Sequence, residues 1–286
     1  MIDQIINKDD MIGKRKNRTH RIYNYKFQKP DSRDKFFPQI VEVKRLKLMT
    51  LPKVVTLRKW CSAIEDQGEL GSCTANAWAG LMQWHENYIE RPAGIPYHDL
   101  SRLFIYYNER VVEGTVDQDA GSELRTGAAV LNQYGVCPEW EWPYWINSFK
   151  TKPTPNCYKD GLPHIINSYY SIKTFTNLKM SLANNLPFVF GFNVYDSFES
   201  DAVSQTGIVP MPDVQTETLL GGHAVMAIGY DDYEKRFLIR NSWGKKWGLH
   251  GVNAGYFTMP YDYLANSNLA SDFWTVVKMS EDPLKL

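Results

Sequence analysis

Residues 66–76 read Asp-Gln-Gly-Glu-Leu-Gly-Ser-Cys-Thr-Ala-Asn and stand directly before a long apolar stretch. Gly68 and Gly71 favour a tight loop, and Ser72 is a good N-cap residue, so we expect a helix to begin at about Cys73. The unpaired N–H groups and the positive dipole end of a helix start stabilise a thiolate. Because the thiolate is the nucleophilic form of cysteine, this stretch predicts a reactive Cys73.

The stretch after Cys73 predicts a buried helix, because its apolar residues between Thr74 and Tyr88 cover most of a helical circumference. Two further helical patterns follow over residues 101–112 and 124–133, the second stopped by Gly135 and Pro138. Short β-branched and aromatic runs then predict strands, and a turn over residues 231–234 joins two of them in a hairpin. These runs occupy residues 187–192, 224–228, 237–239 and 273–277.

Helical patterns that precede strand patterns indicate an α+β fold with two sub-domains that meet at a cleft. The sequence pattern changes from helical to strand-like after about Ser171. We therefore expect a mainly helical sub-domain over residues 51–170 and a mainly β sub-domain over residues 171–286. A charged arm, residues 1–50, precedes the boundary at Leu51-Pro52.

The arm has the opposite charge to the rest of the chain. It holds 13 Lys and Arg against 6 Asp and Glu, a net charge of +7, whereas the remaining residues have 19 against 26, a net charge of −7. The two parts should therefore attract each other. The densest basic cluster, Lys14, Arg15, Lys16 and Arg18, is also typical of a contact with nucleic acid or another polyanion, and a solvated tail is the simpler alternative.

Composition excludes several classes of protein. The chain has 286 residues, of which 43% are hydrophobic and 22% charged, as in ordinary globular proteins. The longest uncharged stretch, residues 180–195, is too short and polar to cross a bilayer, and residues 1–16 lack the apolar core of a secretory signal. We expect a protein without a membrane contact, in the cytoplasm or packaged in a particle such as a virion.

Metal and disulfide chemistry have little support in the sequence. The four cysteines contain no C-x-x-C pair, which argues against a cysteine zinc site and a disulfide-dense scaffold. The histidines outside the candidate site show no metal-ligand spacing, so no metal and no cofactor are expected. These histidines are His20, His85, His98, His164 and His250.

A nucleophilic cysteine needs a base and a group that orients the base, and two downstream residues fit these roles. His223 follows two glycines at the start of a predicted strand, and Asn241 opens Asn-Ser-Trp-Gly after the next strand. A hairpin places both at the same end of the sheet, where the Asn side-chain oxygen can accept the imidazole N–H.

These motifs resemble the papain family of cysteine peptidases over roughly residues 51–277. His223 and Asn241 follow Cys73 by 150 and 168 residues, the second spacing being somewhat long for the family. The resemblance implies a papain-like two-sub-domain fold with a β-barrel-like second part. It also implies roles for further residues. Cys73 is the nucleophile, His223 the acid and base, Asn241 the orienting residue and Gln67 an oxyanion donor; Trp243 covers the His–Asn bond, and Gly121 and Ser122 bind the substrate backbone.

The sequence departs from the family pattern in a coherent way. Leu70 and Asp119 stand where the family has two cysteines that form a disulfide, so both partners are missing together. This loss suits a protein that folds under reducing conditions. Gly255-Tyr256 also comes late after Trp247-Gly248, which predicts a few extra loop residues at about 250–253.

The resemblance implies a cysteine endopeptidase that cleaves polypeptides through a thioester acyl-enzyme. Residues 1–50 precede the point where mature papain-like chains begin, so we interpret them as an autoinhibitory propeptide, with Phe36, Phe37 and Ile40 as apolar anchors. Two alternatives stay open. The loop near His250 could block one end of the cleft and make the chain an exopeptidase, or the basic arm could bind a polyanion on a peptidase scaffold.

Overall fold

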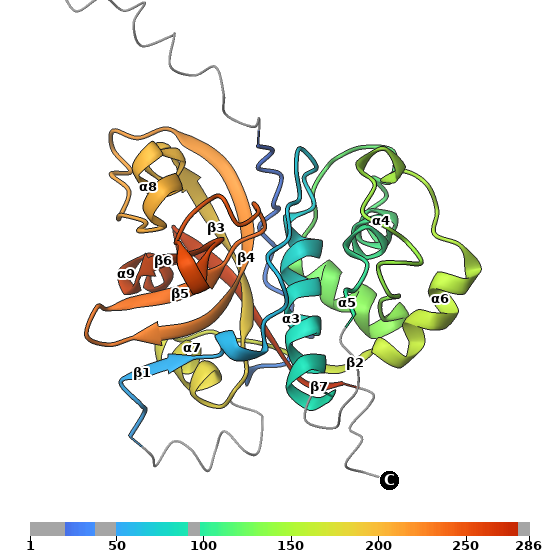
Figure 1. The fold of residues 1–286 in the computed structure, drawn as a ribbon, viewed down its shortest axis with the longest axis horizontal. Coiled ribbons are helices and arrows are strands. Elements are labelled where there is room, and N and C mark those ends of the chain that lie inside the picture. The colour runs from blue at the N-terminus through green and yellow to red at the C-terminus, as the bar shows by residue number, and fades with distance from the viewer. Residues whose placement is uncertain (1–20, 38–49, 91–97, 280–286) are drawn as a thin grey trace, which may run out of the picture.

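The structure is a computed structural model that describes residues 21–37, 50–90 and 98–279. Four α-helices gather on one side and an antiparallel sheet on the other, with helix α3 (Cys73–Glu90) lying between the two parts (Figure 1). This arrangement confirms the α+β class. Among the described residues, no helix combines the length and apolar character that a membrane span requires.

Helix α3 is buried around most of its circumference, as its apolar pattern predicts. Trp78 and Trp84 have no exposed surface, and their indole N–H groups donate to the carbonyls of Leu124 at 3.0 Å and Leu57 at 2.8 Å. Buried indole nitrogens need such partners, because an unpaired buried donor is costly. Trp78 therefore fixes α3 against the helical part, and Trp84 fixes it to Leu57, whose own N–H donates to the Ile228 carbonyl on the sheet side.

The other helices of this part begin and end near the predicted positions. Helix α4 (Arg102–Val112) starts where the Ser101 side chain accepts a hydrogen bond from the Phe104 N–H, and helix α5 (Leu124–Tyr134) ends at Gly135. The short elements that follow are η5 (Ile146–Ser148), α6 (Pro155–Gly161) and η6 (Leu162–His164).

The sheet is open and antiparallel, with the strand order β2-β7-β3-β4-β5-β6 and with β1 paired to β4. It is therefore no closed barrel within the described residues, which corrects the β-barrel-like shape implied by the resemblance. The hairpin predicted at residues 231–234 joins β4 and β5, whose residues Asp231 and Arg236 face each other. The strands are β1 (Val54–Thr56), β2 (Ile166–Ser171), β3 (Phe188–Tyr195), β4 (Leu219–Asp231), β5 (Arg236–Arg240), β6 (Tyr256–Pro260) and β7 (Ala270–Met279).

Short helices and turns complete both parts. Strand β1 and the 3-10 turn η3 (Arg58–Trp60) lie within the half predicted to be mainly helical. The extra loop predicted near residue 250 forms the turn η8 (Gly251–Asn253), where Val252 is 81% exposed and its carbonyl accepts a hydrogen bond from Arg58 at 2.7 Å. The remaining elements are α7 (Phe175–Ala183), η7 (Asp196–Glu199), α8 (Asp201–Thr206) and α9 (Tyr261–Ala265).

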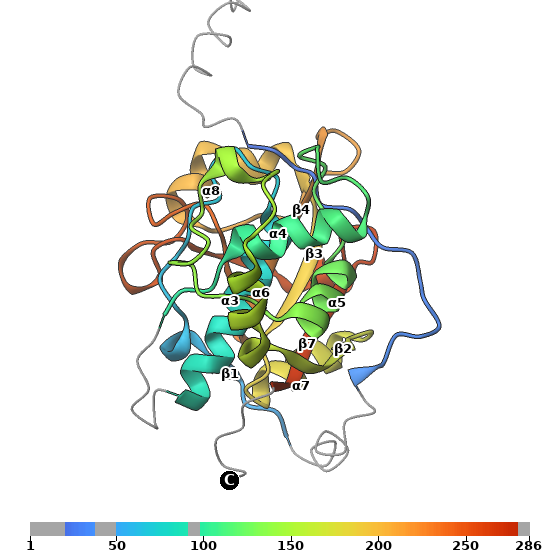
Figure 2. The same ribbon diagram turned by 90° about the vertical axis from the view of Figure 1, so that its right-hand side faces the viewer.

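The N-terminal segment, residues 21–37, crosses the molecule between its two parts. It runs from the upper end of the molecule down one side to the neighbourhood of β2 (Figure 2). Single β-bridges attach it to the sheet side, one between Asn24 and Gly222 and one between Phe36 and Ser171. Residues 21–37 therefore contact two strand regions, at Gly222 and at Ser171, that lie far apart in the sequence.

Candidate active site

Cys73 is the first residue of α3, at the position that the sequence predicts. Its sulfur accepts hydrogen bonds from the backbone N–H groups of Ala224, Thr74 and Cys73 itself. These donors favour the thiolate, as expected at a helix start. Because Ala224 follows His223 directly, the sulfur lies next to the strand that holds the predicted base.

His223 and Asn241 meet where strands β4 and β5 lie side by side. His223 Nε2 lies 2.9 Å from Asn241 Oδ1, which also accepts the Ser242 backbone N–H at 2.9 Å. The Trp243 ring stacks on the imidazole with a centroid separation of 4.8 Å and an interplanar angle of 26°. These contacts fix the ring orientation, and they leave Nδ1 buried with no hydrogen-bond partner among the described residues.

Gln67 lies beside His223 and Asn241 because residues 65–67 run next to residues 242–244, which follow β5. The Gln67 backbone N–H donates to the Ser242 carbonyl at 2.9 Å, and its side-chain Oε1 accepts the Ser242 hydroxyl at 2.6 Å. Its amide Nε2 donates one hydrogen bond, to the Leu70 carbonyl at 3.0 Å. An amide nitrogen carries two hydrogens, so one N–H remains for another acceptor.

The predicted substrate-binding residues contact the N-terminal segment. The Ser122 carbonyl accepts the Lys26 backbone N–H at 3.1 Å, and the Gly222 carbonyl accepts that of Tyr25 at 3.2 Å. Gly121 has a φ of +65°, and a Cβ there would lie 1.8 Å from the Asn24 carbonyl oxygen. Only glycine therefore allows the segment to approach so closely.

The segment also covers the candidate catalytic groups, Cys73 and His223. Cys73 has 0% and His223 has 1% of its surface exposed. The Tyr23 ring lies edge-on to His223, with 6.4 Å between centroids, and the Arg21 guanidinium lies 4.1 Å from the centre of the Trp243 ring. The site is thus closed to a substrate in this conformation.

Burial changes the acid–base state of the covered site. It raises the pKa of the Cys73 thiol to about 12 and lowers the pKa of the His223 imidazole to about 4. Backbone N–H donors oppose the first shift, and the bond to Asn241 opposes the second. Both shifts favour a neutral thiol and a neutral imidazole, so a thiolate–imidazolium pair is disfavoured while the segment is in place.

Asp119 connects the two loops that a disulfide joins in the papain family. Both its carboxylate oxygens lie 3.0 Å from the Gly71 backbone nitrogen, and Oδ1 also accepts the Tyr106 hydroxyl. All four cysteines are free. A charged hydrogen-bond acceptor therefore stands in place of that covalent link near Cys73.

We expect Asp119→Ala to lower the free energy of unfolding by about 2 kcal/mol, because it removes hydrogen bonds to a charged group and leaves their donors unpaired. Urea unfolding followed by circular dichroism measures this change. Asp117→Ala, at an exposed position two residues away, is the matched control and should change stability by less than about 0.5 kcal/mol. Equal losses in the two variants would show that Asp119 does not hold the loops together.

Sequence reasoning missed two residues of this site. Tyr25 lies in the arm, and its hydroxyl bonds to the Asp272 carboxylate at the start of β7. The signal for Tyr25 was a pair of tyrosines, 23 and 25, within an otherwise charged arm. Asp272 interrupts an apolar strand pattern and has a φ of +58°, which is rare for a residue other than glycine.

Residues 51–276 match the sequence model of the family described as papain family cysteine protease. An uncharacterized peptidase C1-like protein of Acanthamoeba polyphaga mimivirus is 41% identical over 288 residues, which cover 92% of this chain and 89% of that protein.

Solved structures of cysteine proteases also resemble this chain. The structure of xylellain, a cysteine protease from Xylella fastidiosa, superposes with a TM-score of 0.79 and 39% identity, covering 90% of this chain and 96% of that one. The procathepsin B of Trypanosoma congolense reaches a TM-score of 0.68 at 19% identity over 90% of this chain and 87% of that one, a likeness that concerns the fold alone.

The fold and these matches define a cysteine peptidase, a hydrolase whose substrate is a polypeptide. More specifically, the chain belongs to the papain family of cysteine proteases. The family resemblance and the papain-like fold predicted from the sequence are confirmed. The roles of the individual site residues stay predictions, and they are the basis of the proposal that follows.

Proposed function

We propose that the chain is a cysteine endopeptidase with the triad Cys73, His223 and Asn241, and that residues 1–50 keep it inactive until they are removed. The path of residues 21–28 carries this proposal. These residues lie over the nucleophile and the base, and they leave Cys73 without exposed surface. A peptide cannot reach that sulfur until the segment leaves.

The chemistry proceeds in two halves. His223 Nδ1 takes the Cys73 proton, and the thiolate attacks the carbonyl carbon of the scissile bond. The Cys73 backbone N–H and the spare Gln67 N–H stabilise the oxyanion. The imidazolium protonates the leaving amine as the C–N bond breaks, which leaves a thioester. His223 then removes a proton from water, the resulting hydroxide attacks the thioester, and Cys73 regains its proton from the imidazolium as the acid leaves.

Tyr25 anchors the inhibitory segment. Its side chain lies against Gly191, where a Cβ would be 1.9 Å from the ring, and its hydroxyl bonds to Asp272. Asp272 also accepts the Gln28 backbone N–H at 3.1 Å. Because Tyr25 is only 5% exposed, its burial contributes roughly 2 kcal/mol or more in addition to these bonds.

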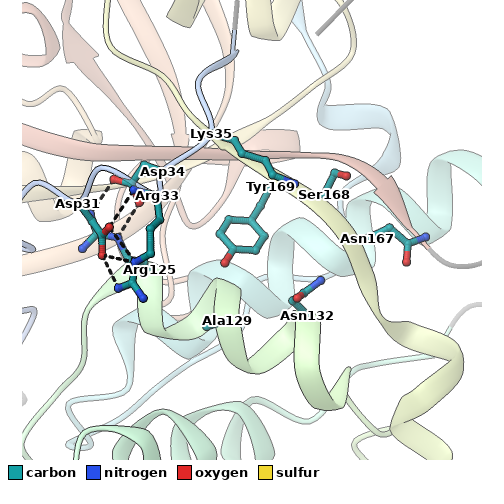
Figure 3. A pocket seen from close by; sticks show the side chains of 10 residues that line it. All are labelled: Asp31, Arg33, Asp34, Lys35, Arg125, Ala129, Asn132, Asn167, Ser168 and Tyr169. Atoms are coloured by element: carbon teal, nitrogen blue, oxygen red, sulfur yellow. Dashed lines mark hydrogen bonds and ion pairs between the residues drawn. The ribbon is translucent and has the colours of Figure 1, made fainter. Parts of the chain in front are cut away.

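Charged contacts extend the attachment beyond the site. Arg125 of α5 pairs with the nearly buried Asp34 at 2.7 Å, at the edge of a cavity of about 350 Å³ between the segment and β2 (Figure 3). Lys26 pairs with Glu113 at 2.7 Å in a more exposed setting. The exposed pair contributes little at physiological salt, so buried groups provide most of the attachment.

The apolar anchors predicted from the sequence differ in burial. Phe37 has 0% of its surface exposed, and Phe36 is 36% exposed and bridges to Ser171. Ile40 lies outside the described residues. Phe37 therefore supports the apolar attachment predicted for the arm.

The segment also favours an endopeptidase over an exopeptidase. It enters beside Trp243, passes Gly222 and Ser122, and continues to Asp272. A site that accommodates a continuous chain segment along this path suits cleavage inside a polypeptide better than cleavage at its end. The loop at residues 250–253 contacts Arg58 through the Val252 carbonyl.

The test compares the full chain with a chain that starts at Leu51, assayed on one fluorogenic peptide. We expect at least about 100-fold higher activity in the shorter chain, because the closed conformation excludes substrate. Full-length Tyr25→Ala should gain at least about tenfold, while Phe27→Ala, an exposed aromatic of the same segment, should gain less than about twofold. If neither truncation nor Tyr25→Ala raises activity in folded protein, the inhibitory role is wrong.

The polyanion alternative rests on residues 14–18, which lie outside the described residues. The same assay at two salt concentrations distinguishes it. Buried anchors predict that inhibition persists at high salt, whereas a polyanion-binding arm predicts salt-sensitive retention of the full chain on a heparin column without a change in peptidase activity.

A further inference from the structure

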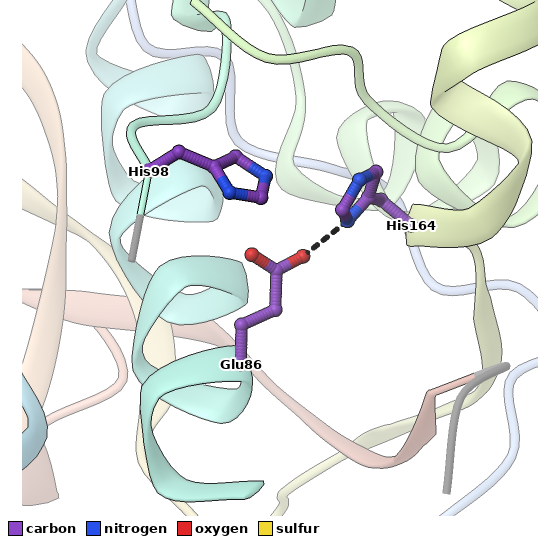
Figure 4. A group of neighbouring side chains, drawn as sticks. All are labelled: Glu86, His98 and His164. Atoms are coloured by element: carbon purple, nitrogen blue, oxygen red, sulfur yellow. Dashed lines mark hydrogen bonds and ion pairs between the residues drawn. The ribbon is translucent and has the colours of Figure 1, made fainter. Parts of the chain in front are cut away.

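Glu86, His98 and His164 form a cluster at the far end of α3 from Cys73. Each offers one potential ligand atom, and these three atoms all lie within 4.8 Å of one another. The residues come from α3, from the chain before α4 and from η6, and Figure 4 shows both imidazole rings turned toward each other above the Glu86 carboxylate. Sequence spacing gave no sign of this group, because its members are 12 and 66 residues apart.

The cluster contains a polar atom whose bonding capacity is unused. His98 Nε2 is buried and has no hydrogen-bond partner among the described residues. Glu86 and His164 form a pair at 2.6 Å, with side-chain exposures of 6% and 14%. Because buried polar atoms are normally paired, an unpaired ring nitrogen in this cluster points to a missing electrophilic partner.

We propose that Glu86, His98 and His164 bind one divalent transition-metal ion of the zinc class. Two imidazoles and one carboxylate are a ligand set that zinc accepts, with a fourth position left for water, whereas calcium and magnesium prefer oxygen ligands. Tetrahedral zinc ligands at roughly 2.0–2.2 Å from the ion lie about 3.3 Å apart, so His98 closes in and the Glu86–His164 pair opens slightly.

The ion would stabilise the helical part and take no part in peptide hydrolysis. Glu86 is 13 residues from Cys73 along α3, a distance of about 20 Å at the rise of an α-helix. The ion would join α3 to the chain before α4 and to the end of η6, adding to the Glu86–His164 pair that already links α3 to η6. Because the ion would bind the folded protein and not the unfolded chain, it would raise the midpoint temperature of thermal unfolding.

The experiment uses the full-length Cys73→Ala chain, so the candidate nucleophilic thiol cannot capture the metal and peptidase activity plays no part. Cobalt(II) serves as the spectroscopic probe, and zinc competition gives the zinc affinity. We expect one equivalent of cobalt with visible d–d bands, a zinc-dependent rise in the thermal midpoint, and at least tenfold weaker binding in His98→Ala and Glu86→Gln. His250→Ala, at an exposed histidine outside the cluster, is the matched control and should bind like the parent.

Three outcomes would overturn the proposal. One is the absence of stoichiometric binding, and another is equal affinity in the His98→Ala and His250→Ala chains. The third is an intense thiolate-to-cobalt charge-transfer band, which would place the ion at the neighbouring group of Cys137, Glu141 and Cys157. Near-ultraviolet circular dichroism checks the fold of each variant, and Glu86→Gln, which keeps the side-chain shape, decides the matter if His98→Ala does not fold.

Discussion

Replacing Cys73 with alanine is expected to reduce peptide hydrolysis by at least about 10,000-fold, measured as kcat/KM on chain freed of residues 1–50. The thiol is the atom that forms the acyl-enzyme in the proposed mechanism, and the other three cysteines are buried. The substitution removes one sulfur from a fully buried position, so the near-ultraviolet spectrum should stay unchanged.

Graded losses at the other two triad positions test the assigned roles. His223→Ala should approach the loss in Cys73→Ala, because His223 moves protons in both halves of the reaction. Asn241→Ala should lose about 100-fold, because it acts through the orientation of the imidazole. Cys61→Ala, another buried cysteine, is the matched control and should keep kcat near that of the parent. Activity in folded Cys73→Ala above the assay background, or a larger loss in Asn241→Ala than in His223→Ala, would contradict this mechanism.

Local sequence patterns predicted the elements that hold the site. Helix α3 begins at Cys73 because glycine turns and a polar residue precede an apolar run, and the hairpin between β4 and β5 follows from turn residues at 231–234. Such signals depend on neighbours in the chain. They placed Cys73 at a helix start and His223 and Asn241 at one end of the sheet, and the 2.9 Å contact between the latter two agrees with that placement.

Contacts between segments distant in the chain gave no such signal. The arm has no helical or strand period, so its path through the site follows from Tyr25, which fits the space left by Gly191 and reaches Asp272. These residues are 166 and 247 positions from Tyr25. The histidine cluster was missed for the same reason, because its ligand spacing exists only after folding.

The replacement of the family disulfide by the Asp119 carboxylate was predicted in part: the sequence indicated the missing disulfide but not the contacts that replace it. The paired absence of cysteines at positions 70 and 119 was readable from the sequence by comparison with the family. What replaces the link was not, because the Asp119 carboxylate accepts a backbone N–H of Gly71 and a hydroxyl of Tyr106. Backbone donors have no identity in a sequence, so their partners become known only from the fold.

Alkylation of Cys73 by iodoacetamide at pH 7 should be at least about 1,000-fold faster in the chain that starts at Leu51 than in the full chain. The reagent attacks the thiolate, and burial raises the pKa of the Cys73 thiol to about 12 in the covered site. With that pKa, only about one thiol in 100,000 is ionised at pH 7. Removal of the segment returns water to the site, which relieves the desolvation that disfavours both charged forms.

The two proteins should also differ in their dependence on pH. In the full chain, burial lowers the pKa of His223 to about 4, so the imidazole is neutral at pH 6–9 and gives the thiolate no positive partner. The alkylation rate of Cys73 in the full chain should therefore rise steadily with pH as long as the pH is below the raised pKa of the thiol. In the shorter chain, uncovered His223 can stay protonated beside the thiolate, so the alkylation rate should reach a plateau near neutral pH. The kcat/KM profile should be bell-shaped, with apparent pKa values that belong to the coupled pair.

Peptide mapping by mass spectrometry separates Cys73 from the other thiols, and protein unfolded in urea gives the rate of a fully accessible thiol. The full chain should label slowly at Cys73 until it unfolds, whereas the shorter chain should label Cys73 faster than the unfolded reference at pH 6, because only a thiol paired with an imidazolium is ionised there. Equal Cys73 rates in the two folded proteins would mean that the segment does not control the nucleophile. A shorter chain that labels faster only as pH rises, without a plateau, would mean that exposure alone increases and that Cys73 and His223 do not form an ion pair.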